Sequence, residues 1–358
     1  MSRTKIAVFV SLSIVGILLT VLLSLWMAFF EPYRRQAVIL KELKAAGLLG
    51  YAYCCDNPRF PEWFIDLLPT SWADSLKPLE FIEIEPQGDT ADFTKIRLIT
   101  RLPLIEDGIA LCQIPVDADL LKALSRHRGI TTIFLNNTKI DNETVQHLTG
   151  FPKLEGLGLA SNAHLTEQGV ADLLKRLPKL KFLELIDFPG IDKFEMRAIA
   201  RHTTLKHLDL RDCLLTDDDL KTLSELKQLH ILTLSQMPGI TEQGILKLFD
   251  NLPELTDFHL KGMSPFSPEA VRKIIADPRL EYLELCDMGL TDAHLKEVVV
   301  GALLFSFDIS DNPEITDAGL KHLHGIGTLK YLYLNGTGVT QEGINAFKAA
   351  QPHCEVIP

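Results

Sequence analysis

The sequence predicts an α/β fold in which short strands alternate with helices in stacked repeats, preceded by one apolar N-terminal segment. Three observations predict it: an apolar pattern returns every 24 to 26 residues, a helix-capping residue follows each copy, and residues 6–30 carry no charge. A period of this length is typical of solenoids, because one such unit is too short to bury its own apolar face.

The composition restricts the class of protein and of partner. The chain has 358 residues, of which 46% are hydrophobic and 23% charged, as in ordinary folded proteins. Its formal net charge is -11. Nucleic-acid phosphates are bound through an excess of Lys and Arg, so this charge argues against a nucleic-acid partner. The six cysteines include no CxxC spacing and predict neither a zinc site nor a disulfide framework.

The apolar segment at residues 6–30 is long enough to cross a membrane. As a helix it would span roughly 37 Å, against about 30 Å for the hydrocarbon core. Trp26, Phe29, Phe30 and Tyr33 lie at its end, where interfacial aromatic residues are expected. The run exceeds a typical signal-peptide core, and no A-x-A cleavage site follows it. We expect an uncleaved helix that anchors the protein in the cell membrane; cleavage, which would give a secreted protein, is the alternative.

Positive charges flank this segment on both sides. Arg3 and Lys5 lie with the α-amine in the short tail at residues 1–5, whereas four basic residues follow the segment between residues 34 and 44. The larger number of basic residues after the segment favours a cytoplasmic repeat domain. The positive charges concentrated in the short tail favour the opposite orientation, with the tail in the cytoplasm. We expect the tail inside and the repeat domain on the non-cytoplasmic side.

The apolar pattern has the form LxxLxL and occurs nine times from residue 130 onward. A residue able to cap a helix lies six or seven positions after the third apolar residue of each copy. Two weaker copies precede these and end on Thr90 and Asp117, so repeats are expected over residues 79–358, with a closing strand at residues 353–358. The nine later capping residues are Asp141, Thr166, Asp192, Thr216, Thr241, Ser267, Thr291, Thr316 and Thr340.

Each unit predicts a strand followed by a helix. Side chains alternate between the two faces of a strand, so the apolar residues at positions 4 and 6 of LxxLxL point to one side. The capping side chain then accepts a hydrogen bond from a free N–H in the first turn of the helix. Ser267-Pro268-Glu269 shows this clearly, with Pro at the first helical position and an acid near the positive end of the helix dipole.

These residues resemble leucine-rich repeats of the short class that carries LxxLxLxxC/N and ITDxGL, as in LKHLDLRDCLLTDDDL at residues 205–220. The resemblance implies a curved solenoid with parallel strands on its concave face and helices on its convex face. Residues 31–78, which include EPYRRQAVILKELKAAGLLGYAY and PEWFIDLLPTSWADSL, are similar to the membrane-proximal region of bacterial membrane-anchored leucine-rich-repeat proteins. That similarity implies a helix, a strand and a second helix, which we interpret as an α/β cap over the repeats.

The ninth position of each repeat is expected to turn inward after the strand. Cys213 therefore has a structural role, and Cys112 and Cys286 are expected to be unreactive thiols on the concave surface. None of the common catalytic, nucleotide-binding or metal-binding motifs occurs in the sequence, so we expect no enzyme activity, no cofactor and no metal. The ninth positions are Thr138, Asn162, Phe188, Cys213, Met237, Met263, Met288, Asn312 and Thr337.

The strand residues that alternate with the leucines are the candidate binding residues. Stacked strands lie about 4.8 Å apart, so acidic residues at the same position in successive repeats become neighbours. Aromatic residues and His are mixed with these acids, as in interface cores, and the acids favour a basic partner. We predict that a protein or peptide of basic character binds this face through Phe182, Glu184, His207, Asp209, Arg211, His259, Tyr282, Glu284, Asp308, Tyr331 and Tyr333.

Two other functions stay open. F-box-type substrate adaptors of ubiquitin ligases carry repeats of the same ITDxGL form, but the predicted membrane span and the lack of an F-box-like segment ahead of the repeats argue against that function. Paired carboxylates such as Glu184–Asp209 and Glu284–Asp308 suit a glycosidase or a hard cation. On an open strand face, however, the composition favours a solvated acidic surface.

Overall fold

The computed structural model describes residues 31–54, 79–103, 105–188, 193–296 and 302–358. It divides into a first unit, Met1–Phe134 with Gly150–Lys153, and a second unit, Leu135–Thr149 with Leu154–Pro358. The expected membrane helix at residues 6–30 and the expected helix that opens at Pro61 lie outside the described residues. Among the residues that are described, no helix is both long enough and apolar enough to span a bilayer.

The first unit combines a small sheet with flanking helices. β1 pairs antiparallel with β2, and β2 pairs parallel with β3. In α2, Ile39 and Leu43 are buried one turn apart, and this helix packs against β1 and η1. The elements in chain order are α2 (Glu31–Ala45), β1 (Leu49–Cys54), β2 (Leu79–Ile84), the 3-10 helix η1 (Phe93–Arg101), β3 (Ile105–Cys112) and α5 (Ala118–Leu124); β4 (Thr132–Asn136) crosses the division between the units.

The capping residue predicted at Thr90 is wrong. η1 begins two residues later than the spacing indicated, and Asp92 caps it by accepting a hydrogen bond from the Thr94 N–H at 3.0 Å. A carboxylate is a strong acceptor at the positive end of a helix, which favours Asp92 as the start of this degenerate repeat. Asp117 caps α5 as predicted, accepting from the Leu120 N–H at 2.7 Å.

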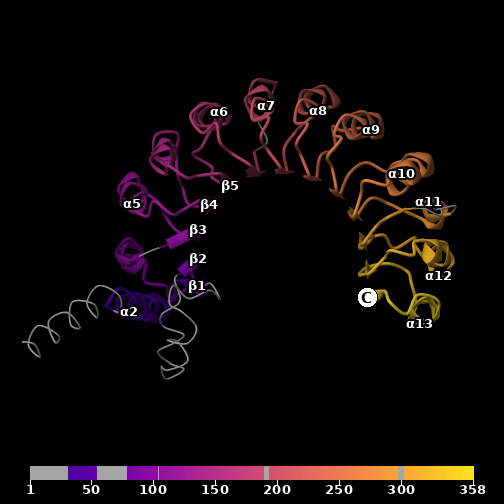
Figure 1. The fold of residues 1–358 in the computed structure, drawn as a ribbon, viewed down its shortest axis with the longest axis horizontal. Helices are drawn as coiled ribbons and strands as arrows, with labels where there is room; N and C mark the ends of the chain where they lie inside the picture. The colour runs from indigo at the N-terminus through magenta and orange to yellow at the C-terminus, as the bar shows by residue number, and fades with distance from the viewer. Residues whose placement is uncertain (1–30, 55–78, 104, 189–192, 297–301) are drawn as a thin grey trace, which may run out of the picture. The chain divides into compact units, whose positions relative to one another are not determined.

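The second unit repeats one strand and one helix, and each strand pairs in parallel with the next in chain order. Within this unit the strands follow the inner side of a curve and the helices its outer side (Figure 1), which confirms the predicted solenoid. The strands are β5 (Gly156–Ala160), β6 (Phe182–Ile186), β7 (His207–Arg211), β8 (Ile231–Ser235), β9 (Asp257–Lys261), β10 (Tyr282–Cys286), β11 (Ser306–Asp308), β12 (Tyr331–Tyr333) and β13 (Glu355–Ile357). The helices are α6 (Glu167–Leu174), α7 (Lys193–Ala200), α8 (Asp217–Leu223), α9 (Glu242–Asp250), α10 (Pro268–Ile275), α11 (Asp292–Leu295), α12 (Asp317–Leu320), η3 (Lys321–Gly325) and α13 (Gln341–Ala350), and η2 (Thr144–Gly150) precedes β5.

The core of the second unit is built from the repeated leucines. Around β7, Leu205, Leu208 and Leu210 are fully buried, and the equivalent residues of the other repeats are buried as well. His207 and Asp209 alternate with them and face the opposite side of the strand. Truncating one such leucine to Ala costs about 2–5 kcal/mol. The leucines therefore determine which residues are left for the outer face of the sheet.

Asparagine at the ninth position binds backbone groups in the turn after the strand. The Asn162 side-chain amide donates to the carbonyl oxygens of Leu135 at 2.8 Å and Ala160 at 3.0 Å. Its oxygen accepts from the Thr138 N–H at 2.9 Å. Asn312 makes equivalent bonds in a later repeat. These bonds satisfy buried peptide groups that no strand or helix pairs.

Apolar residues and Cys213 fill the same position in other repeats. All the predicted ninth-position residues are buried except Thr337, which is partly exposed. The Cys213 Sγ lies 3.3 Å from the carbonyl oxygen of Arg211, and burial raises the pKa of the thiol to about 12. Cys213 is thus a protonated core residue, as the sequence predicted.

A hydrogen-bonded link joins the helix caps of successive repeats. The Asp217 carboxylate, one residue after the cap Thr216, accepts from the Thr241 N–H at 2.8 Å and from its hydroxyl at 2.6 Å. Thr241 in turn caps α9. The same link connects Asn142 to Thr166, Asp292 to Thr316 and Asp317 to Thr340.

The glycine three residues after the cap leaves room for this link. A Cβ on Gly244 would collide with the Asp217 carboxylate. The ITDxGL motif therefore describes a contact between neighbours: Thr caps its own helix, Asp holds the next Thr, and Gly accommodates the preceding Asp. Gly169, Gly319 and Gly343 stand in the same relation to Asn142, Asp292 and Asp317.

Where the preceding repeat has Lys or Pro at that place, the third residue after the cap is not glycine, and its side chain accepts a hydrogen bond from the N–H of its own cap. The repeat before α8 has a lysine there, and Asp219 accepts from the Thr216 N–H at 2.9 Å. The repeat before α11 has a proline there, and the His294 Nδ1 accepts from the Thr291 N–H at 3.0 Å. The two positions are thus coupled across a distance of one repeat.

Gly244→Ala should destabilise the second unit by about 1–3 kcal/mol, because the new methyl group overpacks the site against Asp217. In the Asp217→Ala background the same change should be neutral or stabilising, since Ala favours a helix over Gly by about 1 kcal/mol. Urea unfolding followed by circular dichroism measures the double-mutant cycle. Gly327→Ala is the control, because no atom lies within 4 Å of its added Cβ. An equal cost of Gly244→Ala in both backgrounds would contradict the coupling.

The buried His202 should make the second unit less stable in mild acid. Burial lowers the pKa of its imidazole below the ordinary value of 6.5. Above pH 6.5 the ring is neutral in both states; as the pH falls below it, the unfolded chain takes up the proton first and the free energy of unfolding decreases. Neighbouring repeats hold the buried Leu177 and Leu226 at this position, so His202→Leu should fold.

The measurement is the thermal midpoint of the wild type and of His202→Leu at several pH values on either side of 6.5. The variant should lose less stability toward the acid end than the wild type does. His322→Gln, which removes an exposed imidazole, is the matched control. If His202→Leu and the wild type show the same pH dependence, His202 does not contribute to acid sensitivity.

Candidate partner-binding face

The outward residues of β6 to β12 form rows across the second unit, and we call this surface the strand face. The registers confirm that the pairs Glu184–Asp209 and Glu284–Asp308 are direct neighbours. The middle row from β5 to β12 is Gly158, Glu184, Asp209, Thr233, His259, Glu284, Asp308 and Tyr333. The row two residues earlier is Gly156, Phe182, His207, Ile231, Asp257, Tyr282, Ser306 and Tyr331.

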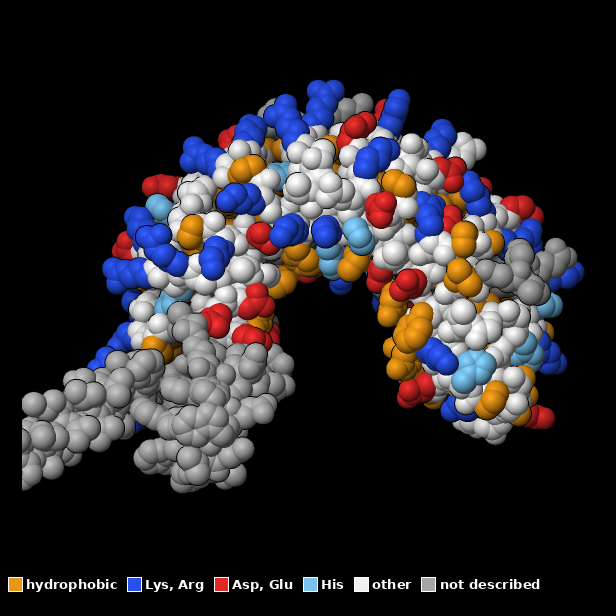
Figure 2. Space-filling view, in the orientation of Figure 1, with side chains coloured by type: hydrophobic (Ala, Val, Ile, Leu, Met, Phe, Trp, Pro, Cys, Tyr) orange, Lys and Arg blue, Asp and Glu red, His pale blue; other side chains and the backbone are white. Residues whose placement is uncertain are grey.

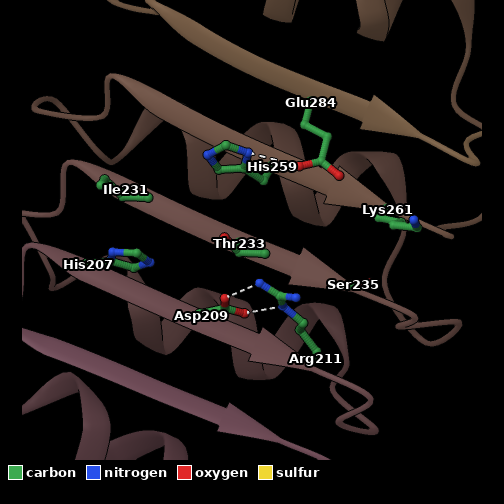
Figure 3. A pocket seen from close by; sticks show the side chains of 9 residues that line it. All are labelled: His207, Asp209, Arg211, Ile231, Thr233, Ser235, His259, Lys261 and Glu284. Carbon is green, nitrogen blue, oxygen red and sulfur yellow. Dashed lines mark hydrogen bonds and ion pairs between the residues drawn. The ribbon is translucent and has the colours of Figure 1, made fainter. Parts of the chain in front are cut away.

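A shallow polar cleft of about 310 Å³ lies on the strand face between β7 and β10. Figure 3 shows side chains from these successive strands projecting into it, with the acids on β7 and β10 separated by the neutral residues of β8. Five of the predicted contact residues meet there. Its lining residues are His207, Asp209, Arg211, Ile231, Thr233, Ser235, His259, Lys261 and Glu284.

Asp209 and Arg211 form a forked ion pair at one side of the cleft. The Arg211 Nε lies 2.8 Å from one carboxylate oxygen of Asp209 and the Nη2 lies 2.5 Å from the other (Figure 3). They lie two residues apart on β7, so both side chains emerge on the same face. Asp209 is only 4% exposed, whereas the Arg211 side chain is 46% exposed. A buried carboxylate thus orients a guanidinium whose outer edge remains open to a partner.

Glu184 lies beside this pair on β6. Burial raises the pKa of Glu184, the negative charge of Asp209 raises it further, and Arg211 opposes the change. Burial and the charge of Asp209 therefore both disfavour the ionised form of Glu184, and Arg211 partly offsets them. A basic group of a partner placed here would form an ion pair with a partly desolvated carboxylate.

His259 and Glu284 form the second polar pair of the cleft. The His259 Nδ1 lies 3.1 Å from the Glu284 carboxylate, and this hydrogen bond lowers the pKa of Glu284 against the opposing effect of burial. Next to them the Lys261 Nζ lies 3.7 Å from the Asp311 carboxylate. The cleft thus combines the Asp209–Arg211 ion pair, the His259–Glu284 hydrogen bond and the ammonium group of Lys261.

The expected surface position of Cys286 is wrong. Cys286 is 3% exposed, and its thiol is hydrogen-bonded to the carboxylates of Glu284 on the same strand and Asp308 on the neighbouring strand. Burial raises the pKa of Cys286 well above its ordinary value, and the two carboxylates raise it further. Strand alternation places Cys286 on the strand face, but it does not reveal that a short side chain there is buried. Cys112 on β3 is partly exposed.

Three exposed aromatic rings lie next to these acids, and we call them the aromatic patch: Tyr282, Phe305 and Tyr331. Each is 37% exposed. The Phe305 ring centroid lies 5.7 Å from that of Tyr282 and 5.6 Å from that of Tyr331, so the rings form one continuous array across three repeats. Figure 2 shows hydrophobic side chains gathered on the inner side of the C-terminal repeats, bordered by acidic ones.

Phe305 was not among the predicted contacts. It precedes β11 by one residue, at a position where neighbouring repeats carry the polar Glu281 and Lys330. The prediction covered only the strand residues that alternate with the leucines, and Phe305 is not one of them. An aromatic residue at a position that is otherwise polar is the signal that the sequence did contain. The ring reaches both tyrosines because the position lies at the entrance of the strand, between their side chains.

The remaining predicted residues occupy the same face outside the cleft and the patch. Phe182 packs edge-to-face on His207 with centroids 4.5 Å apart, and burial lowers the pKa of His207. Asp308 accepts a hydrogen bond from the Ser310 N–H at 2.9 Å, and Tyr333 is half-buried. Within the described ranges, no group of three or more His, Cys, Asp or Glu side chains is placed to hold a metal ion.

Comparisons with known proteins support the repeat architecture. The family model for the leucine rich repeat matches residues 201–224. A chain of the Rad7–Elc1 complex from yeast aligns with a TM-score of 0.66 and 15% identity, over 97% of this chain and 92% of that chain. An internalin from Listeria monocytogenes gives a TM-score of 0.46 at 16% identity, over 83% of this chain and 92% of that chain. At these identities the likeness concerns the fold alone.

The strands pair in parallel in chain order, capped helices follow them, and turn residues bind the backbone in several repeats. These features define a solenoid repeat protein with one open sheet face, and this is the architecture of a leucine-rich repeat protein.

Cys213 and Cys286 should resist alkylation while the protein is folded, because burial keeps both thiols protonated and inaccessible. Iodoacetamide at mildly alkaline pH, followed by peptide mass spectrometry, should label the partly exposed Cys112 before either of them. Unfolding in urea should equalise the rates and is the internal control. If Cys213 is labelled as fast as Cys112 in the native protein, the packing of the ninth position described above is wrong.

Proposed function

We propose that this leucine-rich repeat protein is a membrane-anchored, non-catalytic recognition protein that binds a protein or peptide on its strand face. The observation that supports it most is the aromatic patch beside Glu284 and Asp308. Large exposed aromatic rings that adjoin one another are enriched in interface cores, and they cost free energy when left in water. Tyr282 and Tyr331 alternate with the buried Leu283 and Leu332 of their strands, so their rings lie on the side of the sheet opposite to the core.

The chemistry of the strand face favours a partner with basic and apolar groups together. The rings of the aromatic patch would contact apolar side chains or receive a Lys or Arg by cation–π interaction. Glu284 and Asp308 border them and would pair with its charge. The oriented guanidinium of Arg211 would donate hydrogen bonds to a carboxylate or a backbone carbonyl further along the same partner.

The anchor in this proposal rests on the apolar sequence of residues 6–30. With the tail of residues 1–5 inside, the strand face would meet partners on the non-cytoplasmic side. Protease accessibility of the repeats in intact cells tests this orientation, and sequencing of the mature N-terminus separates an anchored protein from a secreted one.

The adaptor function remains the alternative. Rad7 forms a complex with Elc1, and one chain of that complex shares the present fold. Proximity labelling from the full-length protein distinguishes the two proposals. Recovery of ubiquitin-ligase subunits would favour an adaptor, whereas recovery of proteins from the membrane environment would favour a receptor or scaffold.

Combined substitution of Tyr282, Phe305 and Tyr331 by Ala should weaken binding of a partner identified in this way by at least tenfold, because each ring of an interface core contributes about 1 kcal/mol or more. Titration calorimetry measures the affinity. Tyr51→Ala is the matched control, since Tyr51 is 55% exposed on the first unit. Unchanged affinity in the triple variant would exclude the aromatic patch as the contact, and Glu284→Gln then tests the acids alone.

A further inference from the structure

A second and larger cleft lies in the first unit, between α2 and η1. Its volume is about 690 Å³, and its lining differs in charge from that of the strand face. Seven residues line it: Arg34, Arg35, Val38, Ile39 and Glu42 from α2, and Leu98 and Arg101 from η1. Three arginines thus face one glutamate in a chain whose overall charge is strongly negative.

The helix geometry explains why these residues share one cleft. The five lining positions of α2 are spaced by one, three or four residues, so they form one face of the helix beside η1. Ile39 is buried at the base of this face and Val38 is 50% exposed at its edge. Lys41 and Lys44 add two exposed cations elsewhere on the same helix. The cleft therefore combines cationic groups with exposed apolar surface.

The position of α2 in the chain places this cleft next to the expected membrane span. The helix begins at Glu31, directly after the apolar residues 6–30. Arg34 and Arg35 follow within about one helical turn, or roughly 6 Å along the axis. The headgroup layer beyond the hydrocarbon core is itself roughly 5–8 Å thick on each side. In the anchored protein, both arginines would lie at the depth of the lipid phosphates.

We propose that the cleft between α2 and η1 binds the headgroup of an anionic phospholipid. This inference rests on the membrane anchor of the proposed function, and it is independent of the partner on the strand face. The guanidinium groups of Arg34, Arg35 and Arg101 bind the phosphate through paired N–H donors. Val38 and Leu98 contact the glycerol and the upper acyl chain. Each basic residue near an anionic membrane contributes a factor of about five in binding.

The test uses the full-length chain reconstituted in lipid nanodiscs. One set contains phosphatidylcholine alone, and the other contains phosphatidylcholine with about one third phosphatidylglycerol, so that surface charge is the variable. Hydrogen–deuterium exchange with mass spectrometry follows the backbone amides of α2 and η1. We expect slower exchange of both helices in the anionic discs, and we expect high salt to reduce the difference.

The combined variant Arg34→Gln, Arg35→Gln and Arg101→Gln should lose this lipid-dependent protection. The matched control removes the same charge from exposed sites of the second unit through Lys221→Gln, Lys227→Gln and Lys247→Gln, and it should keep the protection. Should the arginine variant unfold, which exchange in β2 and β3 would reveal, the single variant Arg101→Gln replaces it. That variant should reduce the protection in part.

The outcomes of this experiment distinguish failure of the lipid site from failure of the membrane anchor. If the chain enters the discs and α2 exchanges equally in both lipids, the lipid site is wrong and the anchor stands. If the chain does not enter the discs, the anchor fails and the lipid site fails with it.

Discussion

The repeats of the second unit bury their strand leucines only against one another, and this constraint determines the rest of the unit. Because Leu208 and Leu210 must face the core, His207, Asp209 and Arg211 must face outward. The parallel registers then bring the same position of every repeat into one row. The strand face is therefore a consequence of core packing, and its chemistry can vary without cost to the fold.

The contact between successive caps adds a second constraint. Asp217 both occupies the first turn of its own helix and holds Thr241 of the next repeat. This double role accounts for Asp217, and Asp219 binds its own cap, so two of the three acids of LTDDDL have structural roles. It also explains the link between an acid in one repeat and glycine in the next. A solenoid built in this way transmits a local change to its neighbours first, as expected for nearest-neighbour stability.

The sequence predicted the repeat period, most caps and the register of the strand face, because these depend on spacing within one repeat. It did not reveal contacts that require two repeats at once. Phe305 joins rings of the repeats on either side, and the Cys286 thiol is hydrogen-bonded to a carboxylate of the following strand. The cap was predicted at Thr90 instead of Asp92 because the first repeat is degenerate and its helix begins two residues later than the spacing indicates. The roles of the strand face in binding remain a prediction.

The two parts of the strand face contribute differently to recognition. In the cleft, Arg211 forms an ion pair with Asp209 and His259 is hydrogen-bonded to Glu284, so a partner must replace or extend existing polar contacts. Replacing one polar contact by another contributes little net free energy of binding. A partner whose charges do not match, however, would leave these groups unpaired and would bind less well. The aromatic patch has no such cost, since its rings exchange water for a partner's apolar surface. Affinity should therefore come mainly from Tyr282, Phe305 and Tyr331, whereas the polar cleft, which adjoins them at β10, should determine which partner is accepted.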